Sequence, residues 1–515
     1  MTAAELGLVF LGVLLFTLSF PSFLSDRGWA FLGFFALLPI FYLIPKISWT
    51  KTVLYGGLYG WSSYALFNFW LITFNPVAFS VVPTVYLLYG MALFPLLKAA
   101  TLLLPHYRPW ILTLVWVSYE FLKTQGFLGY SYGVLGYVHW ENPLLIQLAS
   151  LGGVWPLSFL TVFPSAFLAE LFATKKFDKR LKIGLGIYSG LMVLSVIWGV
   201  MSPLETKNLP HWKTALIQND MDPWIGGDEG YSQGLQRLTS LSTAAAREKP
   251  EAIIWPETSF VPSIFYHKKY REDPLRYQLV VELENYLKSS SADFILGNGH
   301  GERRLIPGKG GQSARVDYNS SFLYSQGQFT QRYDKIHLVP FTENFPFRGP
   351  LTPVYEYLKN ADTHFWEAGR DYTVFTLPGV KFSTPICFED TFGSLNREFV
   401  LQGAQVLVNL SNDSWSGVKT NMYQHFAIGV FRAVENRRSL LRSTAGGITA
   451  SVDPNGKILG ELSPYTQGYL MAEVPLVTEV KTLYTLWGDW MAYFMVILTL
   501  VGLGYGVWGL VRKIS

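Results

Sequence analysis

Long apolar segments recur through the first two-fifths of this 515-residue chain, and one more lies near its end. A helix of about 20 apolar residues crosses the roughly 30 Å hydrocarbon core of a bilayer. Eight segments approach or exceed this length, and we expect each to form one transmembrane helix. They are residues 5–24, 28–45, 53–74, 79–104, 108–124, 146–173, 183–202 and 490–511. The sequence therefore predicts a multi-pass membrane protein.

The composition supports the same class of protein. Half of the residues are hydrophobic and only 15% are charged, whereas a soluble domain carries about 25% charged residues. These values exclude a disordered, collagen-like or coiled-coil chain. The net charge of +4 gives no reason to expect nucleic-acid binding. With one cysteine, the chain forms no internal disulfide and no multi-thiolate metal site, and we expect neither a metal nor a cofactor.

Charged residues are distributed unevenly along the chain. Only 11 of the 41 basic and 6 of the 37 acidic residues precede Pro203. We therefore expect three parts: a membrane domain of seven helices at 1–204, a catalytic domain at 205–486, and a last transmembrane helix with a short cytoplasmic tail at 487–515. The first span lacks a basic start and a cleavage site, so we interpret it as a retained helix rather than a signal peptide.

Basic residues between the spans predict the orientation. The connection at 175–182 is the most basic one, so the positive-inside rule places it in the cytoplasm. Arg512 and Lys513 then fall on the same side, as do Lys46 and Lys51. The long segment between the last two spans is therefore expected outside the cytoplasm.

That segment alternates short apolar runs with helical stretches, which predicts a layered α/β domain. We expect helices at 235–247, 273–288 and 423–436, and a mobile glycine-rich loop at 303–313. The expected strands are 214–218, 252–255, 293–297, 321–324, 380–386, 404–410 and 448–452.

Two familiar motifs have structural explanations here. Gly129–Gly133 matches the G-x-S-x-G pattern of serine hydrolases, but it lies between two apolar spans and not on a strand-to-helix turn. Gly504–Gly509 matches G-x-G-x-x-G, but it lies inside the last span, where glycines permit close helix packing. We expect neither a serine nucleophile nor a dinucleotide site.

Three segments carry the candidate chemistry. Cys387 directly follows an apolar strand, Glu257 follows another in Trp255-Pro256-Glu257, and Lys335 lies among apolar residues in 332–341. Each has a simpler explanation when taken alone: a buried free cysteine, a loop carboxylate, and a lysine with its stem on apolar surface. Together, a thiol, a carboxylate that accepts its proton and a cation that stabilises an oxyanion suit acyl transfer through a thioester.

The three segments, in this chain order, resemble the Glu, Lys and Cys motifs of the nitrilase superfamily. The resemblance implies an αββα sandwich, with Glu257 as base, Lys335 as oxyanion stabiliser and Cys387 as nucleophile.

Seven apolar spans before such a domain, and one after it, resemble the apolipoprotein N-acyltransferase family over essentially the whole chain. The segments 338–344, 409–415, 424–425, 432–435, 442–444, 447–449 and 453–457 extend the resemblance. It implies transfer of an acyl chain from a phospholipid, usually phosphatidylethanolamine, to the α-amine of the diacylglyceryl-cysteine that begins a lipoprotein. We expect the protein to act as a monomer in the bilayer.

The resemblance also implies supporting residues. Glu343 and Glu389 match positions near the family's active site, where we expect them to orient Lys335 or the thiol. Trp224 is a candidate substrate contact, although its spacing from Gln218 is short.

Three positions depart from the family pattern. They are Phe388, where tyrosine is common, Ser416, where phenylalanine is usual, and Ala445, where asparagine is often found. We expect these departures to affect acceptor or acyl preference rather than the type of reaction.

Some alternatives remain open at this stage. The aromatic residues Phe260, Phe265, Tyr266, Phe345 and Phe347 either guide acyl chains or anchor loops at the membrane interface. The catalytic set alone also suits a membrane-tethered amidase or nitrilase in which water resolves the thioester. A scaffold or transporter with a degenerate external domain is the non-enzymatic alternative, and the complete Glu, Lys and Cys set argues against it.

Overall fold

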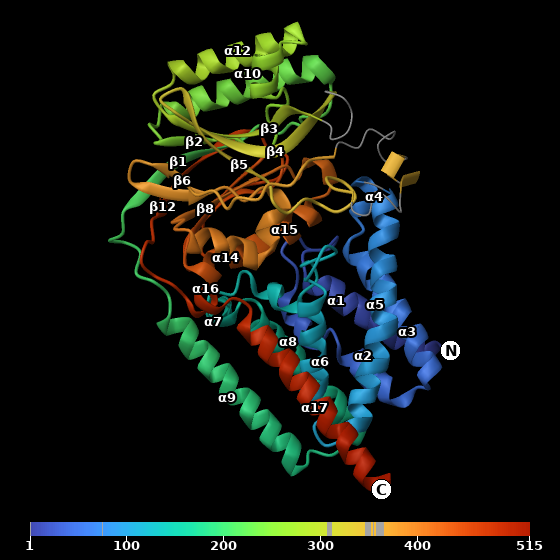
Figure 1. Cartoon of the computed structure of the whole chain (residues 1–515). Helices are drawn as coiled ribbons and strands as arrows, with labels where there is room; N and C mark the ends of the chain where they lie inside the picture. The colour runs from blue at the N-terminus through green and yellow to red at the C-terminus, as the bar shows by residue number, and fades with distance from the viewer. Residues whose placement is uncertain are drawn as a thin grey trace. The chain divides into compact units, whose positions relative to one another are not determined.

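The computed structural model describes residues 2–74, 76–305, 312–345, 352–353, 355–356 and 365–514. The chain divides into two compact units (Figure 1). The first contains Met1–Leu204, Ser416–Glu435 and Lys481–Ser515, and the second contains Glu205–Trp415 and Asn436–Val480. The segment 416–435, which lies inside the expected catalytic domain, therefore packs with the N-terminal helices.

The first unit is helical. Four of its helices are long and apolar enough to cross a membrane within the described residues: Phe79–Leu103, Trp155–Thr174, Lys179–Met201 and Trp490–Arg512. Its longer helices are α1 (Ala3–Ser19), α3 (Trp49–Phe67), α5 (Pro76–Leu103), α6 (Arg108–Leu122), α8 (Trp155–Thr174), α9 (Lys179–Met201), α15 (Lys419–Asn436, which extends one residue into the second unit) and α17 (Trp490–Ile514). Figure 1 shows α17 running beside α6, with which it packs.

The expected single helix at 28–45 is wrong. The chain there forms three short pieces: η1 (Ala30–Phe35), α2 (Leu38–Leu43) and η2 (Ile44–Lys46). Pro39 and Pro45 each stand in the first turn of a piece. Proline lacks the N–H that continues a helix from the preceding turn, so each proline starts a new piece.

The expected spans at 53–74 and 146–173 are also interrupted. The first ends with α3 and restarts as α4 (Leu71–Phe74). The second consists of η4 (Leu145–Leu148), α7 (Ala149–Gly152) and α8, with a break at Gly153. The φ of Gly153 is +71°, a left-handed conformation that ends a helix and favours glycine. Between α6 and η4 the chain forms η3 (Leu135–His139).

Glycines set the contact between α3 and α5. A Cβ on Gly56 would lie 2.2 Å from the carbonyl oxygen of Gly90, and a Cβ on Gly90 would lie 2.0 Å from that of Gly56. A Cβ on Gly60 would lie 2.0 Å from Tyr86 O. Small residues let two helix backbones approach this closely, so any larger residue here would push the helices apart.

Helix α15 is held in the first unit by a buried amide. Gln424 accepts a hydrogen bond from Trp70 Nε1 at 2.9 Å and donates to the carbonyls of Pro21 at 2.9 Å and Phe67 at 3.1 Å. Further along the helix, Arg432 and Glu435 form a buried ion pair at 2.7 Å. The hydrogen bonds of Gln424 tie α15 to the N-terminal part of the chain, and α16 (Leu483–Trp487) belongs to the same unit.

The second unit contains two six-stranded sheets, in the orders β12-β1-β2-β3-β4-β5 and β11-β10-β9-β8-β7-β6. Trp212 on β1 stacks on Phe382 on β7, with ring centroids 5.1 Å apart, so the sheets face each other. The strands are β1 (His211–Gln218), β2 (Ala252–Ile254), β3 (Asp293–Leu305), β4 (Ser313–Ser325), β5 (Gln328–Asp334), β6 (Phe375–Leu377), β7 (Val380–Ser383), β8 (Val406–Ser411), β9 (Ser439–Thr444), β10 (Thr449–Val452), β11 (Ile458–Leu462) and β12 (Gly468–Pro475).

Helices cover the first sheet. Apolar residues of α10 (Gly227–Ala246) and α12 (Pro274–Ser289) share a buried core with Trp255, Phe294 and Phe322 (Figure 1). The shorter helices are α11 (Ile264–Tyr270), α14 (Gly393–Leu401), η5 (Cys387–Thr391) and η6 (Ser414–Ser416). This arrangement confirms the predicted α/β layers.

The expected loop at 303–313 is partly wrong. β3 and β4 remain paired as far as Leu305 and Ser313, because the antiparallel ladder continues through the polar residues at its end. Residues 306–311 lie outside the described part of the chain.

Candidate active site

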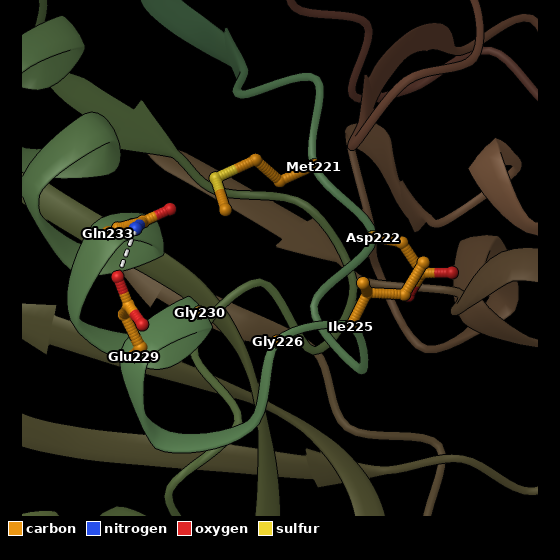
Figure 2. A pocket seen from close by; sticks show the side chains of 7 residues that line it. All are labelled: Met221, Asp222, Ile225, Gly226, Glu229, Gly230 and Gln233. Atoms are coloured by element: carbon orange, nitrogen blue, oxygen red, sulfur yellow. Dashed lines mark hydrogen bonds between the residues drawn. The ribbon is translucent and has the colours of Figure 1, made fainter.

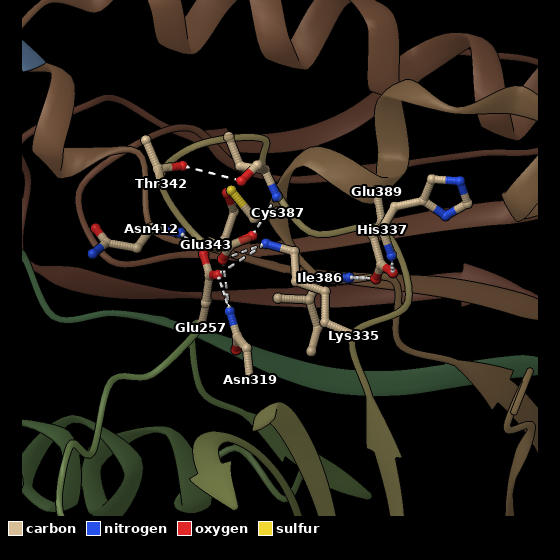
Figure 3. Close-up of polar contacts among 12 residues, drawn as sticks. Glu257, Asn319, Lys335, His337, Thr342, Glu343, Ile386, Cys387, Glu389 and Asn412 are labelled. Carbon is tan, nitrogen blue, oxygen red and sulfur yellow. Dashed lines mark hydrogen bonds and ion pairs between the residues drawn. The ribbon is translucent and has the colours of Figure 1, made fainter. Parts of the chain in front are cut away.

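Glu257, Lys335 and Cys387 come from three separate places in the second unit. Glu257 follows β2, Lys335 follows β5, and Cys387 opens η5 after β7. Figure 3 shows the three side chains gathered in one cluster with Glu343. The structure therefore brings together the three residues that the sequence singled out.

Cys387 occupies a sharp turn. Its φ is +50°, a conformation that costs a non-glycine residue energy and persists only where neighbouring contacts enforce it. Asn409 enforces it by donating from Nδ2 to the carbonyls of Pro385 at 3.2 Å and Cys387 at 3.1 Å. Cys387 as a residue is partly buried.

The ammonium of Lys335 is fully buried between two carboxylates. Its Nζ lies 2.8 Å from Glu343 Oε1 and 3.6 Å from Glu257 Oε1. Burial disfavours the charge, but the two carboxylates outweigh it and raise the pKa of Lys335 above its ordinary value. Lys335 is therefore a cation at neutral pH.

Glu257 is buried and receives two hydrogen bonds. Asn319 Nδ2 donates to Oε1 at 2.8 Å, and the backbone N–H of Asn412 donates to Oε2 at 2.9 Å. Burial raises the pKa of Glu257, and nearby Lys335 opposes that rise. A carboxylate with a raised pKa accepts a proton more readily than an exposed one.

Asn319 is a site residue that the sequence interpretation missed. Besides Glu257, its Nδ2 donates to Glu343 Oε1 at 3.2 Å, so one amide fixes two carboxylates. Glu343 Oε2 also accepts from Val339 N at 2.8 Å. The available signal was the polar run Asn319-Ser320-Ser321 directly ahead of the apolar residues Phe322 and Leu323 in β4.

Glu389 ties two backbone segments together. Its Oε1 accepts from Tyr333 Oη at 2.8 Å, Ile336 N at 2.8 Å and His337 N at 3.0 Å, and its Oε2 accepts from Ile386 N at 2.7 Å (Figure 3). These bonds join the chain beside Lys335 to the chain beside Cys387. Glu389 thus acts on the cluster through the backbone.

The thiol of Cys387 is neutral at rest. Burial, followed by the negative charge of Glu257, raises the pKa of Cys387 well above its ordinary value. A thiolate therefore forms only when a base removes the proton as the thiol attacks. Among the described residues, no group of three or more His, Cys, Asp or Glu side chains is arranged to hold a metal ion.

Trp224 lines a cavity near this cluster. Its side chain is 49% exposed, and its ring centroid lies 6.4 Å from that of Trp366, whose backbone N–H donates to Glu343 O at 2.8 Å. The cavity, of about 250 Å³, is also lined by Arg276 and Arg315. A second cavity, of about 400 Å³, is lined by residues from Met221 to Gln233 at the start of α10 (Figure 2).

The aromatic side chains expected at a membrane interface are mostly in cores. Phe260 and Tyr266 are buried, and Phe265 packs on Phe329 with ring centroids 4.7 Å apart. These three bury their rings against the first sheet, so the expectation that they guide lipid or anchor a loop is wrong. Phe345 is also buried, and Phe347 lies outside the described residues.

The departures from the family pattern occupy packed positions. Phe388 packs against Phe392, with ring centroids 4.9 Å apart. Ser416 is buried and donates to Val418 O at 3.2 Å, and Ala445 is buried with its carbonyl accepting from Asp220 N at 2.7 Å.

Ser131 of the G-x-S-x-G match is buried, in the chain between α6 and η3, and Gly504–Gly509 lies within α17.

Comparisons with known proteins decide the family. Residues 213–482 match the carbon-nitrogen hydrolase family model, and residues 12–167 match the apolipoprotein N-acyltransferase N-terminal domain. Apolipoprotein N-acyltransferase 1 of Treponema denticola is 38% identical, over 96% of this chain and 94% of its own. The chain belongs to the apolipoprotein N-acyltransferase family. It is thus a member of an acyltransferase family and a membrane protein.

One further curated relative and one solved structure are also similar to this chain. Apolipoprotein N-acyltransferase 1 of Treponema pallidum is 40% identical, over 96% of this chain and 94% of its own. Among solved structures, Nit3 of Saccharomyces cerevisiae, a member of the nitrilase superfamily, is 21% identical with a TM-score of 0.37, covering 53% of this chain and 93% of its own.

Proposed function

We propose that this protein moves an acyl chain from a phospholipid, through a thioester on Cys387, to the α-amine of the diacylglyceryl-cysteine that begins a lipoprotein. The observation that carries the proposal is the buried cluster in which Glu257 and Lys335 lie beside the partly buried Cys387. By family resemblance the donor is phosphatidylethanolamine.

The first half of the reaction forms the thioester. Glu257 removes the thiol proton as the sulfur of Cys387 attacks the ester carbonyl of the phospholipid. The ammonium of Lys335 donates a hydrogen bond to the oxyanion. When the carbon–oxygen bond of the ester breaks, Glu257 returns the proton to the departing glycerol oxygen, which leaves as a lysophospholipid.

The second half transfers the acyl group. The neutral α-amine of the acceptor attacks the thioester carbonyl, and Glu257 takes one of its protons. Lys335 again stabilises the oxyanion. The carbon–sulfur bond then breaks, Glu257 returns the proton to the sulfur, and an amide and a free thiol result. Donor and acceptor thus use one site in turn, in a ping-pong cycle.

Supporting roles follow from the contacts. We assign Glu343 and Asn319 to orienting Lys335 and Glu257, and Glu389 to holding the backbone on either side of the cluster. The cavity beside Trp224 is large enough for a polar part of a substrate. Trp224 is half-exposed there, which suits a substrate contact.

The location of the reaction follows from the basic connections between the spans. We propose a monomer in a bacterial inner membrane, with the catalytic domain on the extracytoplasmic face and the connection at 175–182 in the cytoplasm. Both substrates are lipids anchored in one leaflet, so a thiol at that face can reach an ester without drawing the lipid into water.

A membrane-tethered amidase that resolves the thioester with water is the alternative. Acylation is the same in both enzymes, so the fate of the thioester must be measured. The match of residues 12–167 to the N-terminal domain of the acyltransferase family favours transfer to an amine.

Mass spectrometry of the purified protein tests the proposal. Incubation with phosphatidylethanolamine should add one acyl mass to wild-type protein and none to Cys387→Ala. A diacylated lipopeptide should then remove that mass and become triacylated. Loss of the acyl group as free fatty acid, at the same rate with and without the peptide, would support the amidase. Absence of any acyl mass would contradict the thioester mechanism.

A further inference from the structure

A fully buried arginine lies behind the nucleophile. Arg442 is in β9, within the second sheet, and no part of its side chain is exposed. Its guanidinium forms ion pairs with Asp390 through Nη1 and with Asp413 through Nη2, the latter at 2.8 Å. Both carboxylates are buried as well. Burying three charges is costly unless they are paired and hydrogen-bonded, so this network needs an explanation.

Each partner of Arg442 belongs to a segment that carries the candidate site. Asp390 lies in η5, three residues after Cys387. Asp413 follows Asn412, whose backbone N–H donates to Glu257. The network therefore reaches both the nucleophile and the base.

A third partner connects Arg442 to the turn itself. Arg442 Nη1 donates to Asn409 Oδ1 at 2.9 Å. The amide nitrogen of the same Asn409 donates to the carbonyls of Pro385 and Cys387. The guanidinium thus fixes which way the Asn409 amide faces, and that amide holds the two carbonyls of the turn.

The unfavourable conformation of Cys387 explains what this network does. A φ of +50° is unfavourable for cysteine, and such a turn persists only when its surroundings hold it. A guanidinium presents donors in a rigid planar fork, so one side chain can hold three acceptors in fixed directions. A lysine carries the same charge but lacks this planar arrangement of donors.

We propose that Arg442 is a positioning residue for the nucleophile, which holds the turn at Cys387 and the chain at Asn412 in one network. The relative placement of the thiol and of Glu257 then depends on Arg442, which acts through Asp390, Asn409 and Asp413. This inference rests on the proposed function, because positioning matters only if the thiol attacks an ester.

The test compares two matched substitutions. Arg442→Lys keeps the charge and removes the fork. Arg438→Lys is the control: Arg438 is also buried and precedes β9 directly, but it donates to the carbonyls of Ala404 at 3.0 Å and Val480 at 2.9 Å. Any general effect of replacing a buried arginine by lysine should appear in both variants.

Two rates are measured for each protein, per folded molecule. One is thioester formation with phosphatidylethanolamine in a single turnover, and the other is alkylation of the single cysteine by iodoacetamide across a pH series. Small misplacements of reacting groups cost about 10²-fold in rate. We expect Arg442→Lys to form the thioester about 10²-fold more slowly and its alkylation midpoint to move to higher pH, with Arg438→Lys close to wild type in both.

Several outcomes would overturn the proposal. Wild-type rates in folded Arg442→Lys would do so, and so would an equal loss in Arg438→Lys, which would make the effect merely structural. If Arg442→Lys does not fold, Asn409→Asp decides, because it keeps the acceptor for Arg442 and loses the donors to the turn. A wild-type rate in Asn409→Asp overturns the proposal, and a loss like that expected of Arg442→Lys supports it. If the wild-type protein gains no acyl mass, the proposed function fails, while the alkylation profiles still decide the role of Arg442.

Discussion

The ammonium nitrogen of Lys335 lies 2.8 Å from Glu343 Oε1, inside direct hydrogen-bonding distance. Its distance to the proposed base is longer, at 3.6 Å. Glu343 is thus the carboxylate closest to the ammonium of Lys335, and Glu257, the proposed base, forms a weaker ion pair with it. Since a tight ion pair would favour the ionised form of a carboxylate, this geometry preserves the proton affinity of the base.

Glu343→Gln should therefore slow thioester formation. Without the negative charge at this position, the ammonium of Lys335 moves toward Glu257, whose pKa falls and whose strength as a base declines. We expect a loss of about 10²-fold, at the lower end of the range for general base catalysis. The rate of acyl-mass gain measures it, with Thr342→Val as a neighbouring control. A wild-type rate in Glu343→Gln would remove Glu343 from the mechanism.

The pH dependence of acylation should report Glu257. Burial raises the pKa of Glu257 above its ordinary 4.5, and only the ionised form accepts the thiol proton, so the rate should fall with acid at a pH above 4.5. Lys335 lowers that pKa, so Lys335→Met should move this fall to higher pH. Losing the oxyanion donor should also slow the reaction about 10²–10³-fold. A shift toward lower pH in Lys335→Met would contradict this electrostatic relationship.

Glu389 should make stability depend on pH. Burial raises the pKa of Glu389 to about 7, above its ordinary 4.5, so the folded state binds this proton more tightly than the unfolded state. The resulting stabilisation is complete below about pH 4.5 and is lost as pH rises through about 7, a change of about 3 kcal/mol at most.

Thermal unfolding in detergent across about pH 4 to 9 measures this effect, because the series begins below the unfolded-state pKa and ends above the folded-state pKa of Glu389. Glu389→Gln should be less stable overall, because the amide nitrogen of glutamine is a donor and would face the N–H and O–H groups from which Glu389 accepts. The variant should also lack this pH-dependent loss of stability. An identical pH dependence in the variant would show that other groups cause it.

Gln424→Ala should destabilise the first unit. The substitution leaves Trp70 Nε1 and two backbone carbonyls without their buried partner, and each such group costs about 1–3 kcal/mol. Unfolding temperature in detergent measures the loss. Lys419→Ala, at the exposed first residue of α15, serves as the control. Equal unfolding temperatures for Gln424→Ala and the control would show that the amide contributes nothing.

The proposed sidedness can be tested with single cysteines. Thr376→Cys, at the exposed position of β6, and Lys176→Cys, in the basic connection, are each placed in a Cys387→Ala background. A membrane-impermeant thiol reagent should label the first in intact spheroplasts and the second only after lysis. The reverse pattern would place the catalytic domain in the cytoplasm and end the proposal of acyl transfer at the outer face.

The sequence predicted the candidate site better than the path of the membrane segments. Glu257 and Cys387 follow short apolar runs, and with Lys335 they match three family motifs in chain order, so the motifs taken together were enough to find them. Asn319 escaped because its role depends on two carboxylates far away in the chain. Hydropathy over a window counts apolar residues but not proline or glycine geometry, so it missed the breaks at Pro39 and Gly153.

Long-range pairing explains the remaining differences. β12 pairs with β1 across more than 200 residues, so no local pattern predicts its place in the first sheet. The aromatic residues from Phe260 to Tyr266 look alike in sequence whether they line a core or a membrane interface. Only their burial against the first sheet distinguishes the two.

Helix α15 connects two neighbouring parallel strands, β8 and β9, yet most of it packs with the N-terminal helices. Between two neighbouring strands of the second sheet, the chain therefore leaves the second unit and contributes a helix to the first. No pair of cuts can release a complete soluble enzyme, since any fragment that keeps β8 joined to β9 also carries the buried Gln424 and the Arg432–Glu435 pair into water. Membrane insertion and completion of the second sheet should then be coupled steps in the biogenesis of this protein.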